Sequence, residues 1–257
     1  MAAEFAALLQ ARMSSSRLPG KVFMDIQGQK SLGFQINRIL EAKTVSRVVV
    51  LTSTDDSDDV IQQYCSENAI ECFRGNLLNV FSRFREYLIS SGYSEKYFFR
   101  MTADCPLICS DVIDSITELV YKTDCDYASN TLNPFFPDGL DVELISTDLF
   151  LSIDESLLSK YQTEHVTPFI YQTQNFTKLA NLSFPVNLSG LRMTLDTIDD
   201  FNLINKILEE VPLVAQNSKL SAILGWINEK GGSLNSLNLR NCITDNSFFE
   251  YTMTYEK

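Results

Sequence analysis

The chain has 257 residues, of which 45% are hydrophobic and 21% charged, values typical of a folded globular protein with a sizeable core. The 33 acidic residues outnumber the 21 basic ones, and the net charge of −12 argues against a general nucleic-acid binder, because such a field repels phosphate backbones. One small nucleotide in a locally basic pocket is still compatible with it. We expect no membrane partner and a cytoplasmic location, since there is neither a signal-peptide pattern nor an apolar run of about 18 residues.

The six cysteines are predicted to be free thiols, because a chain of this length without a signal-peptide pattern rarely depends on disulfides. Cys105 and Cys109 are separated by three residues, which is a poor zinc spacing, and His165 is the only histidine. The sequence therefore predicts no zinc site.

The first half of the chain alternates between apolar strand-like runs and segments with helical spacing. In chain order we expect a strand at 5–10, a helix around 32–40, a strand at 47–52, a helix at about 57–67, a strand at 69–73, a helix at 77–88, a strand at 97–101 and a helix at 113–120. Such alternation predicts an α/β fold with a mostly parallel sheet, helices on both faces and right-handed crossovers.

The pattern changes after Tyr127, where Asn and Pro residues punctuate a loop that ends near Gly139. We expect short strands at 127–129, 140–145, 178–184 and 191–195, and helices at about 147–158, 162–173 and 201–208. The sequence predicts a single domain over 1–257 in which 131–190 is an inserted subregion. The apolar residues of this subregion suit a dimer interface, although ordinary internal packing explains them as well. The segment after 233 is left without an assignment.

Residues 10–21, Q-A-R-M-S-S-S-R-L-P-G-K, lie where the first predicted strand ends. Ligands of open α/β sheets bind at the carboxyl ends of strands. Three cations, three adjacent hydroxyls and a Pro-Gly turn are parts that a triphosphate site needs. The segment is not a Walker A loop, since G-x-x-x-x-G-K-[ST] is absent. A solvated basic loop is the competing interpretation.

Two aspartates follow predicted strands and are candidate ligands of one metal ion. Asp104 closes the strand at 97–101 in R-M-T-A-D-C-P-L-I, and Asp196 closes the strand at 191–195 in R-M-T-L-D-T-I-D-D. Mg²⁺ is commonly held by one or two carboxylates together with substrate phosphates. The alternative for Asp104 is a turn cap, and Asp199 and Asp200 are explained by a helix N-terminus. His165 suits a structural role better than that of a general base.

These segments resemble the superfamily of acylneuraminate and 3-deoxy-manno-octulosonate cytidylyltransferases, and are most similar to its spore-coat polysaccharide biosynthesis branch. The resemblance runs in order from about residue 6 to 210. Beside the three segments above, the matching elements are F-R-G-N-L-L-N-V-F-S-R-F (73–84), F-P-D-G-L-D-V-E (136–143) and E-H-V-T-P (164–168). It implies a Rossmann-like nucleotidyltransferase fold with a seven-stranded mixed sheet. It also implies Mg²⁺-dependent transfer of CMP from CTP to a sugar acid or related sugar acceptor, with release of pyrophosphate, for surface polysaccharide biosynthesis, in an enzyme that is commonly a homodimer.

The resemblance assigns roles to named residues. It places catalysis at Arg12, Lys21, Asp104 and Asp196, with the two aspartates holding Mg²⁺. Nucleotide binding is assigned to Gln10, Ala11, Arg12, Ser14, Ser15, Ser16, Arg17, Lys21, Arg74, Thr102 and Ala103. Acceptor binding is assigned to Asp138, Gly139, Asp141 and Glu143 within the 131–190 subregion, and we add His165 there, independently of the resemblance, as an acceptor-side contact only. Ser14 stands where the family usually has glycine, so a loop that needs a positive φ there would carry strain.

Three other functions are compatible with the same pattern. A related fold could transfer a different nucleotide. A glycosyltransferase of similar fold would depend on a D-x-D metal motif, and the chain contains Asp56-Ser57-Asp58 and Asp124-Cys125-Asp126. The first is explained by helix capping, and the second stays open. A nucleotide-binding subunit without turnover is the third, and Ser14 is the feature that leaves it open.

Overall fold

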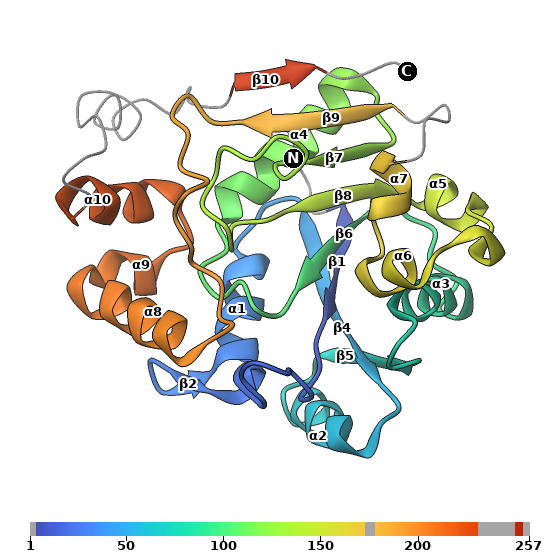
Figure 1. Cartoon of the computed structure of the whole chain (residues 1–257), viewed down its shortest axis with the longest axis horizontal. Coiled ribbons are helices and arrows are strands. Elements are labelled where there is room, and N and C mark those ends of the chain that lie inside the picture. The colour runs from blue at the N-terminus through green and yellow to red at the C-terminus, as the bar shows by residue number, and fades with distance from the viewer. Residues whose placement is uncertain (1–3, 173–177, 231–249, 254–257) are drawn as a thin grey trace.

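A computed structural model describes residues 4–172, 178–230 and 250–253. Its centre is an eight-stranded sheet with the order β10-β9-β7-β8-β6-β1-β4-β5 (Figure 1). The strands are β1 (Phe5–Gln10), β4 (Val45–Ser53), β5 (Glu71–Gly75), β6 (Tyr97–Thr102), β7 (Tyr127–Ser129), β8 (Glu143–Ser146), β9 (Leu179–Ser183) and β10 (Glu250–Met253). Only β8 and β10 run antiparallel to their neighbours. The α/β prediction is confirmed.

Seven of these strands lie within residues 5–183, the number that the resemblance implies, and β10 is added beyond β9 by the C-terminal part of the chain. A separate small hairpin pairs β2 (Asp25–Ile26) with β3 (Gln29–Lys30). Within the described ranges, no helix has both the length and the apolarity needed to cross a bilayer. Cys65, Cys72, Cys105, Cys109 and Cys125 are free thiols, and Cys242 lies outside the described residues.

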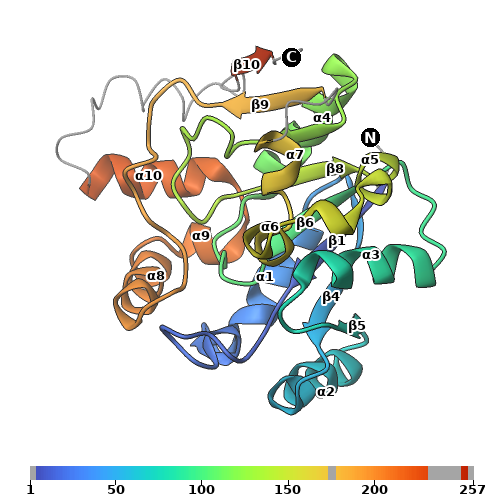
Figure 2. The same ribbon diagram turned by 45° about the vertical axis from the view of Figure 1, so that its right-hand side comes forward.

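Helices cover both faces of the sheet. They are α1 (Ser31–Leu40), α2 (Asp59–Glu67), α3 (Val80–Ser90), α4 (Ser110–Thr123), α5 (Thr147–Ser152), α6 (Lys160–His165), α7 (Pro168–Gln172), α8 (Ile198–Glu210), α9 (Pro212–Gln216) and α10 (Leu220–Lys230), with short 3₁₀ turns η1 (Lys21–Phe23), η2 (Asp56–Asp58) and η3 (Glu155–Leu157). In Figures 1 and 2, α8–α10 lie on one side of the strands, and α3 with α5–α7 lies on the other.

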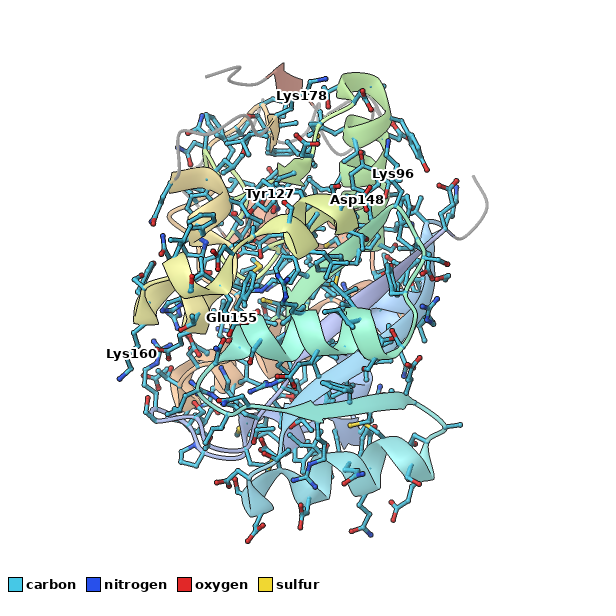
Figure 3. The ribbon with its side chains drawn as sticks, turned by 90° about the vertical axis from the view of Figure 1, so that its right-hand side faces the viewer. Lys96, Tyr127, Asp148, Glu155, Lys160 and Lys178 are labelled. Atoms are coloured by element: carbon cyan, nitrogen blue, oxygen red, sulfur yellow. The ribbon has the colours of Figure 1, made fainter. Side chains whose placement is uncertain are left out.

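Two hydrophobic cores result from the period-two alternation of the central strands. In β1, Ala7 and Leu9 join the core under α1, α4, α8 and α10, whereas Ala6 and Leu8 join the core under α3 and α5–α7. Because both faces are covered, β1 is apolar from Phe5 to Leu9, as a central parallel strand requires, and only its last residue, Gln10, is polar. Figure 3 shows the side of the molecule that α3 and α5–α7 cover, and labels Tyr127, which is buried.

Several predictions for the second half need correction. The predicted helix at 147–158 is α5 followed by η3, and the one at 162–173 is interrupted between α6 and α7. The interruption comes at Val166, which has a φ of 71°, two residues before Pro168, whose ring lacks an N–H. The predicted strand at 140–145 begins only at Glu143.

The predicted strand at 191–195 is wrong. The segment forms a single parallel bridge between Asp138 and Arg192, and no ladder. Its backbone N–H groups instead donate to loops, with Met193 N–H bonded to the Asp138 carbonyl and Leu195 N–H to the Asp104 carbonyl, each at 2.7 Å. The apolar run correctly predicts that this segment is buried. No strand forms, because its backbone N–H groups find carbonyl acceptors in loops and not in a neighbouring strand.

Candidate active site

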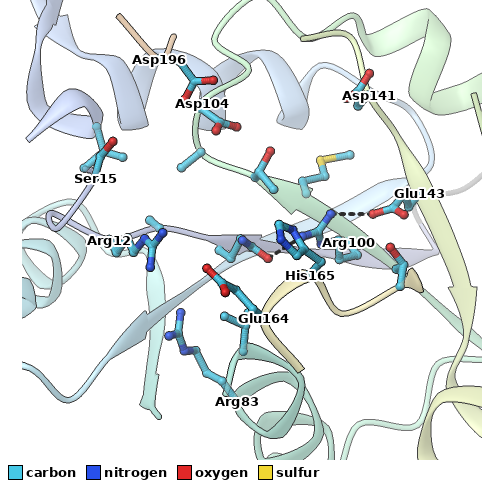
Figure 4. A pocket seen from close by; sticks show the side chains of 18 of the residues that line it. Arg12, Ser15, Arg83, Arg100, Asp104, Asp141, Glu143, Glu164, His165 and Asp196 are labelled. Atoms are coloured by element: carbon cyan, nitrogen blue, oxygen red, sulfur yellow. Dashed lines mark hydrogen bonds and ion pairs between the residues drawn. The ribbon is translucent and has the colours of Figure 1, made fainter. Parts of the chain in front are cut away.

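A cavity of about 450 Å³ opens at the carboxyl ends of β1 and β6 (Figure 4). One side of it is formed by the loop between β1 and η1, which we call the phosphate loop (residues 11–20). The other side is formed by the start of β8 and by α6 and α7, and we call it the acceptor side. The loop after β6 and Asp196 lie between the two sides. The cavity thus lies where open α/β sheets hold their ligands.

The phosphate loop is organised around the backbone of Met13. Its carbonyl accepts hydrogen bonds from the N–H groups of Ser15 and Gly20, both at 2.9 Å, and its own N–H donates to the Asp58 carboxylate at 2.7 Å. Gly20 has a φ of 74°, a conformation that favours glycine. Ser14 is not among the described residues with positive φ, so the replacement of the family's glycine carries no backbone strain of that kind.

Lys21 joins the two candidate metal ligands. Its Nζ lies 2.9 Å from Asp104 Oδ2 and 2.7 Å from Asp196 Oδ1, and the Lys21 and Asp196 side chains are each only 11% exposed. Burial pushes the pKa of Asp104 upward, but the charge of Lys21 and hydrogen bonds from Thr102, Lys21 and Cys105 outweigh it and leave that pKa below the usual value. Asp104 is therefore an ionised carboxylate at neutral pH.

Asp196 carries two further cations. The guanidinium groups of Arg17 and Arg192 each donate to Asp196 Oδ2 at 2.7 Å. The backbone N–H of Asp196 donates to Asp200, which also completes a capping box with Thr197 at the start of α8. The two aspartates converge as expected, although Asp196 follows an irregular segment and not a strand. Arg192 was not anticipated by the sequence analysis.

The pair Asp104 and Asp196 fits a hard divalent cation. Both offer carboxylate oxygens, and the ammonium group between them shows that the two carboxylates can share one cation. Across the part of the chain that the structure describes, no group of three or more His, Cys, Asp or Glu residues forms a metal site. A bound Mg²⁺ would thus take its remaining ligands from phosphate oxygens and water, as is usual for this ion.

Arg100 forms the floor of the acceptor side. From the middle of β6 it donates to Glu143 Oε2 at 2.8 Å and to Gln10 Oε1 at 2.9 Å (Figure 4). Glu143 Oε1 in turn accepts a hydrogen bond from the Tyr127 hydroxyl at 2.5 Å. Burial lowers the pKa of Arg100, but Glu143 more than compensates and raises it. The floor is a fixed network whose opposite charges largely cancel.

Asp141 is a largely buried acidic group of the acceptor side for which no ion pair is found in the part of the chain that the structure describes. Burial, together with Asp138, Glu143 and Asp104, raises its pKa to about 7. No hydrogen bond or ion pair to its carboxylate is found among the described residues. His165 also lines the cavity, with its ring 4.4 Å from that of Tyr161. These groups can accept hydrogen bonds from a hydroxylated or protonated ligand.

Most of the residues assigned from the resemblance line the cavity, but Ser14, Arg74, Asp138 and Gly139 do not. Arg74 turns away and donates to the carbonyls of Ser53 and Asp55 and to the Asp59 carboxylate, so it ties α2 to the sheet. Asp138 and Gly139 contact the segment before Asp196.

Several residues that line the cavity, Arg83 and Glu164 among them, were not predicted from the sequence. Arg83 is buried and donates to the carbonyls of Asn76 and Leu77. No sequence signal pointed to it, because Arg83 lies beside the apolar stripe of the helix predicted at 77–88, a position typical of a solvated charge. Glu164 had only the E-H-V-T-P match.

Neither D-x-D motif lines the cavity. Asp124 caps the end of α4 with a φ of 47°, and its side chain is 78% exposed near Lys96 and Lys178. Asp58 is buried and bound to the phosphate loop. The feature that kept a glycosyltransferase open is therefore absent from the cavity.

Comparison with known proteins shows which family the chain belongs to. A family model described as "Cytidylyltransferase" matches residues 6–221. The chain is 31% identical over 233 residues to the protein MJ1063 of Methanocaldococcus jannaschii, covering 90% of this chain and 93% of that one. It is 26% identical over 211 residues to the spore coat polysaccharide biosynthesis protein SpsF of Bacillus subtilis, covering 79% and 85% of the two chains.

Solved structures agree with these matches. A cytidylyltransferase from Leptospira borgpetersenii superposes with a TM-score of 0.80 at 25% identity, covering 90% of this chain and 96% of that one. A CMP:2-keto-3-deoxy-manno-octonic acid synthetase in complex with CTP has a TM-score of 0.58 at 14% identity, covering 80% and 99% of the two chains, and shares the fold.

Proposed function

The chain belongs to the cytidylyltransferase family, and we propose that it transfers CMP from CTP to a sugar acid or related sugar acceptor with the help of Mg²⁺. The observation that carries this proposal is Lys21, whose ammonium group lies between Asp104 and Asp196 beside the basic phosphate loop. This arrangement offers a triphosphate both cations and a pair of carboxylates for a metal ion. The names of SpsF and of a 3-deoxy-manno-octulosonate cytidylyltransferase from Porphyromonas gingivalis, 26% identical over 179 residues, favour a sugar acid and a place in polysaccharide biosynthesis.

In the proposed reaction, an acceptor oxygen forms a bond to the α-phosphorus of CTP, the bond to the bridging oxygen breaks, and pyrophosphate leaves. Catalysis of such transfers is mostly positioning and charge neutralisation. Arg12, Lys21 and Arg17 bind the phosphates and stabilise the charge that develops on pyrophosphate. Mg²⁺, when bound by Asp104 and Asp196, supplies additional neutralisation and lowers the pKa of the acceptor hydroxyl.

We assign nucleotide binding to the phosphate loop with Gln10, Thr102 and Ala103, and acceptor binding to Asp141, Glu143 and His165. The acceptor-side residues belong to the 131–190 subregion, which supports its proposed role in binding the acceptor. The homodimer, the cytoplasmic location and the extent of the domain over 1–257 stay predictions. Ser14 is the feature that left a subunit without turnover open, and because it lies outside the positive-φ region it gives that alternative no support.

Two measurements test this function. A thermal-shift panel of the four nucleoside triphosphates with Mg²⁺ should show stabilisation by CTP, because a ligand at 100 times its Kd adds about 2.7 kcal/mol. Pyrophosphate release is then measured with CTP and a panel of keto-sugar acids and sugar phosphates. Equal stabilisation by all four nucleotides, or release of a nucleoside diphosphate from a nucleotide sugar, would contradict the proposal.

A further inference from the structure

Asp58 is a buried carboxylate outside the cavity that binds the phosphate loop. It is the last residue of η2 and directly precedes α2, a few residues after the end of β4, and its relative exposure is 0%. Oδ1 accepts the N–H of Met13 at 2.7 Å, across 45 positions of sequence. Oδ2 accepts the N–H of Ser53 at 3.2 Å and the Ser53 hydroxyl. Asp58 thus connects the end of one strand to the loop that follows its neighbour.

Helix capping does not explain this carboxylate. Asp58 occupies the N-cap position of α2, where an aspartate ordinarily accepts an N–H of the first turn, but its side chain makes no capping hydrogen bond. The cap of η2 is supplied by Asp55, which accepts the N–H of Ser57. Asp59, the next residue, is exposed and pairs with Arg74. Of these three acids, only Asp58 is buried with its carboxylate bound to the phosphate loop.

Holding an ionised carboxylate inside a protein is costly unless hydrogen bonds satisfy it. Here the three donors come from Met13 and Ser53, and the buried guanidinium of Arg83 adds a favourable charge interaction without a hydrogen bond to Asp58. The loop would lose this anchor if the carboxylate were removed. Backbone N–H groups of Ser14, Ser16 and Arg17, next to the anchored Met13, have no acceptor among the described residues. They can donate to phosphate oxygens.

We infer that Asp58 is a positioning residue, which holds the phosphate loop through Met13 in the geometry that binds the β- and γ-phosphates of the nucleotide. It touches neither substrate nor metal. Because this hydrogen bond exists before the nucleotide binds, the nucleotide does not have to order the loop. The conformational entropy of the loop is lost during folding, so it does not weaken the binding free energy. This inference rests on the proposed function, since it requires a bound triphosphate.

The decisive variant is Asp58→Ser in the full chain, since its hydroxyl is too short to reach the Met13 N–H, whereas the amide oxygen of an asparagine could still accept it. The control is Asp59→Ser, one residue along and exposed. Calorimetry with Mg²⁺ gives the Kd of CTP and of CMP, which lacks the β- and γ-phosphates. We expect Asp58→Ser to weaken CTP binding at least tenfold, as loss of a hydrogen bond to a charged group does, and CMP binding less than threefold. Asp59→Ser should change neither.

The outcomes separate the two proposals. If the unaltered protein does not bind CTP, the proposed function fails. If it binds CTP and Asp58→Ser binds it equally well, or loses CTP and CMP affinity equally, the positioning role is wrong. Ser53→Ala removes the hydroxyl contact but leaves Met13 bonded, so it should lower the melting temperature without changing the Kd of CTP. Asp58→Ala, which also leaves the Met13 N–H without its acceptor, replaces Asp58→Ser if the latter does not fold, with the same selective loss expected.

Discussion

The two sides of the cavity are built in different ways. The phosphate loop is one continuous segment whose cations and backbone N–H groups come from 11–20, with Lys21 directly after it. The acceptor side is assembled from β8, α6 and α7 above Arg100 of β6, and its ionisable groups are mainly carboxylates beside Arg100 and His165. A bound triphosphate carries the same charges whatever the acceptor, so a local motif suffices for it. An acceptor is recognised by shape and hydrogen bonds, which needs residues from several elements.

The largest effect should come from removing the cation beside the phosphate loop that binds the two aspartates between the sides. Lys21→Ala removes the cation between Asp104 and Asp196, and we expect kcat for pyrophosphate release to fall 10²–10³-fold, about 3–4 kcal/mol, as for loss of other preorganised electrostatic contacts. The control is Lys30→Ala, an exposed lysine at the edge of the β2–β3 hairpin. Unchanged turnover in Lys21→Ala would remove Lys21 from the catalytic site.

A substitution at Gly139 tests how the position of Asp196, between the two sides of the cavity, depends on the backbone segment that precedes it. Gly139 has a φ of 102°, and a Cβ there would lie 2.6 Å from the Met193 carbonyl carbon and 2.7 Å from the Thr194 nitrogen. Gly139→Ala should lower the free energy of unfolding by about 1–3 kcal/mol and also reduce turnover. Gly190→Ala, with nothing within 4 Å of the added Cβ, is the matched control for denaturant titration. Equal stability of the two variants would contradict this account.

A pH titration tests the acceptor side alone. The pKa of Asp141 is near 4 in the unfolded chain and about 7 in the folded one, so between these values the folded protein holds more protons and rising pH lowers its stability. Asp141→Asn should therefore raise the free energy of unfolding above pH 7 by about 1–2 kcal/mol, less than the full shift because solvent reaches part of the side chain. Near pH 4 the two proteins should differ little. A variant that is less stable at pH 8 would show that Asp141 has a stabilising partner.

The smallest effect on the cavity is expected at Arg74. Because its guanidinium binds the end of β4 and the start of α2, Arg74→Ala should cost about 1–2 kcal/mol of stability and leave the Kd of CTP within a factor of two. Chemical denaturation and calorimetry give the two quantities. A tenfold loss of CTP affinity would restore the nucleotide-binding role that the family resemblance assigns.

How well the sequence predicts a site residue depends on whether its partners are near in the chain or distant. Arg12, Lys21 and Asp104 could be identified because cations and a carboxylate at strand ends have a direct physical meaning in an α/β sheet. Arg74 has the right chemistry and a matching motif, but it binds the carbonyls of Ser53 and Asp55, at and after the end of β4, and the Asp59 carboxylate at the start of α2. Asp58 was interpreted as a cap from local spacing, and only its contact with Met13, 45 positions away, shows the other role.

The sequence by itself determined the alternation of strands and helices, the two-sided burial of β1 and the basic composition of residues 10–21, because these depend on side-chain periodicity and on neighbours along the chain. Only the tertiary structure decided that 191–195 is not a strand, that Asp196 nevertheless meets Asp104 and Lys21, and that Asp141 forms no ion pair within the described residues. These outcomes depend on which distant groups are brought within hydrogen-bonding reach, and spacing along a chain does not contain that information.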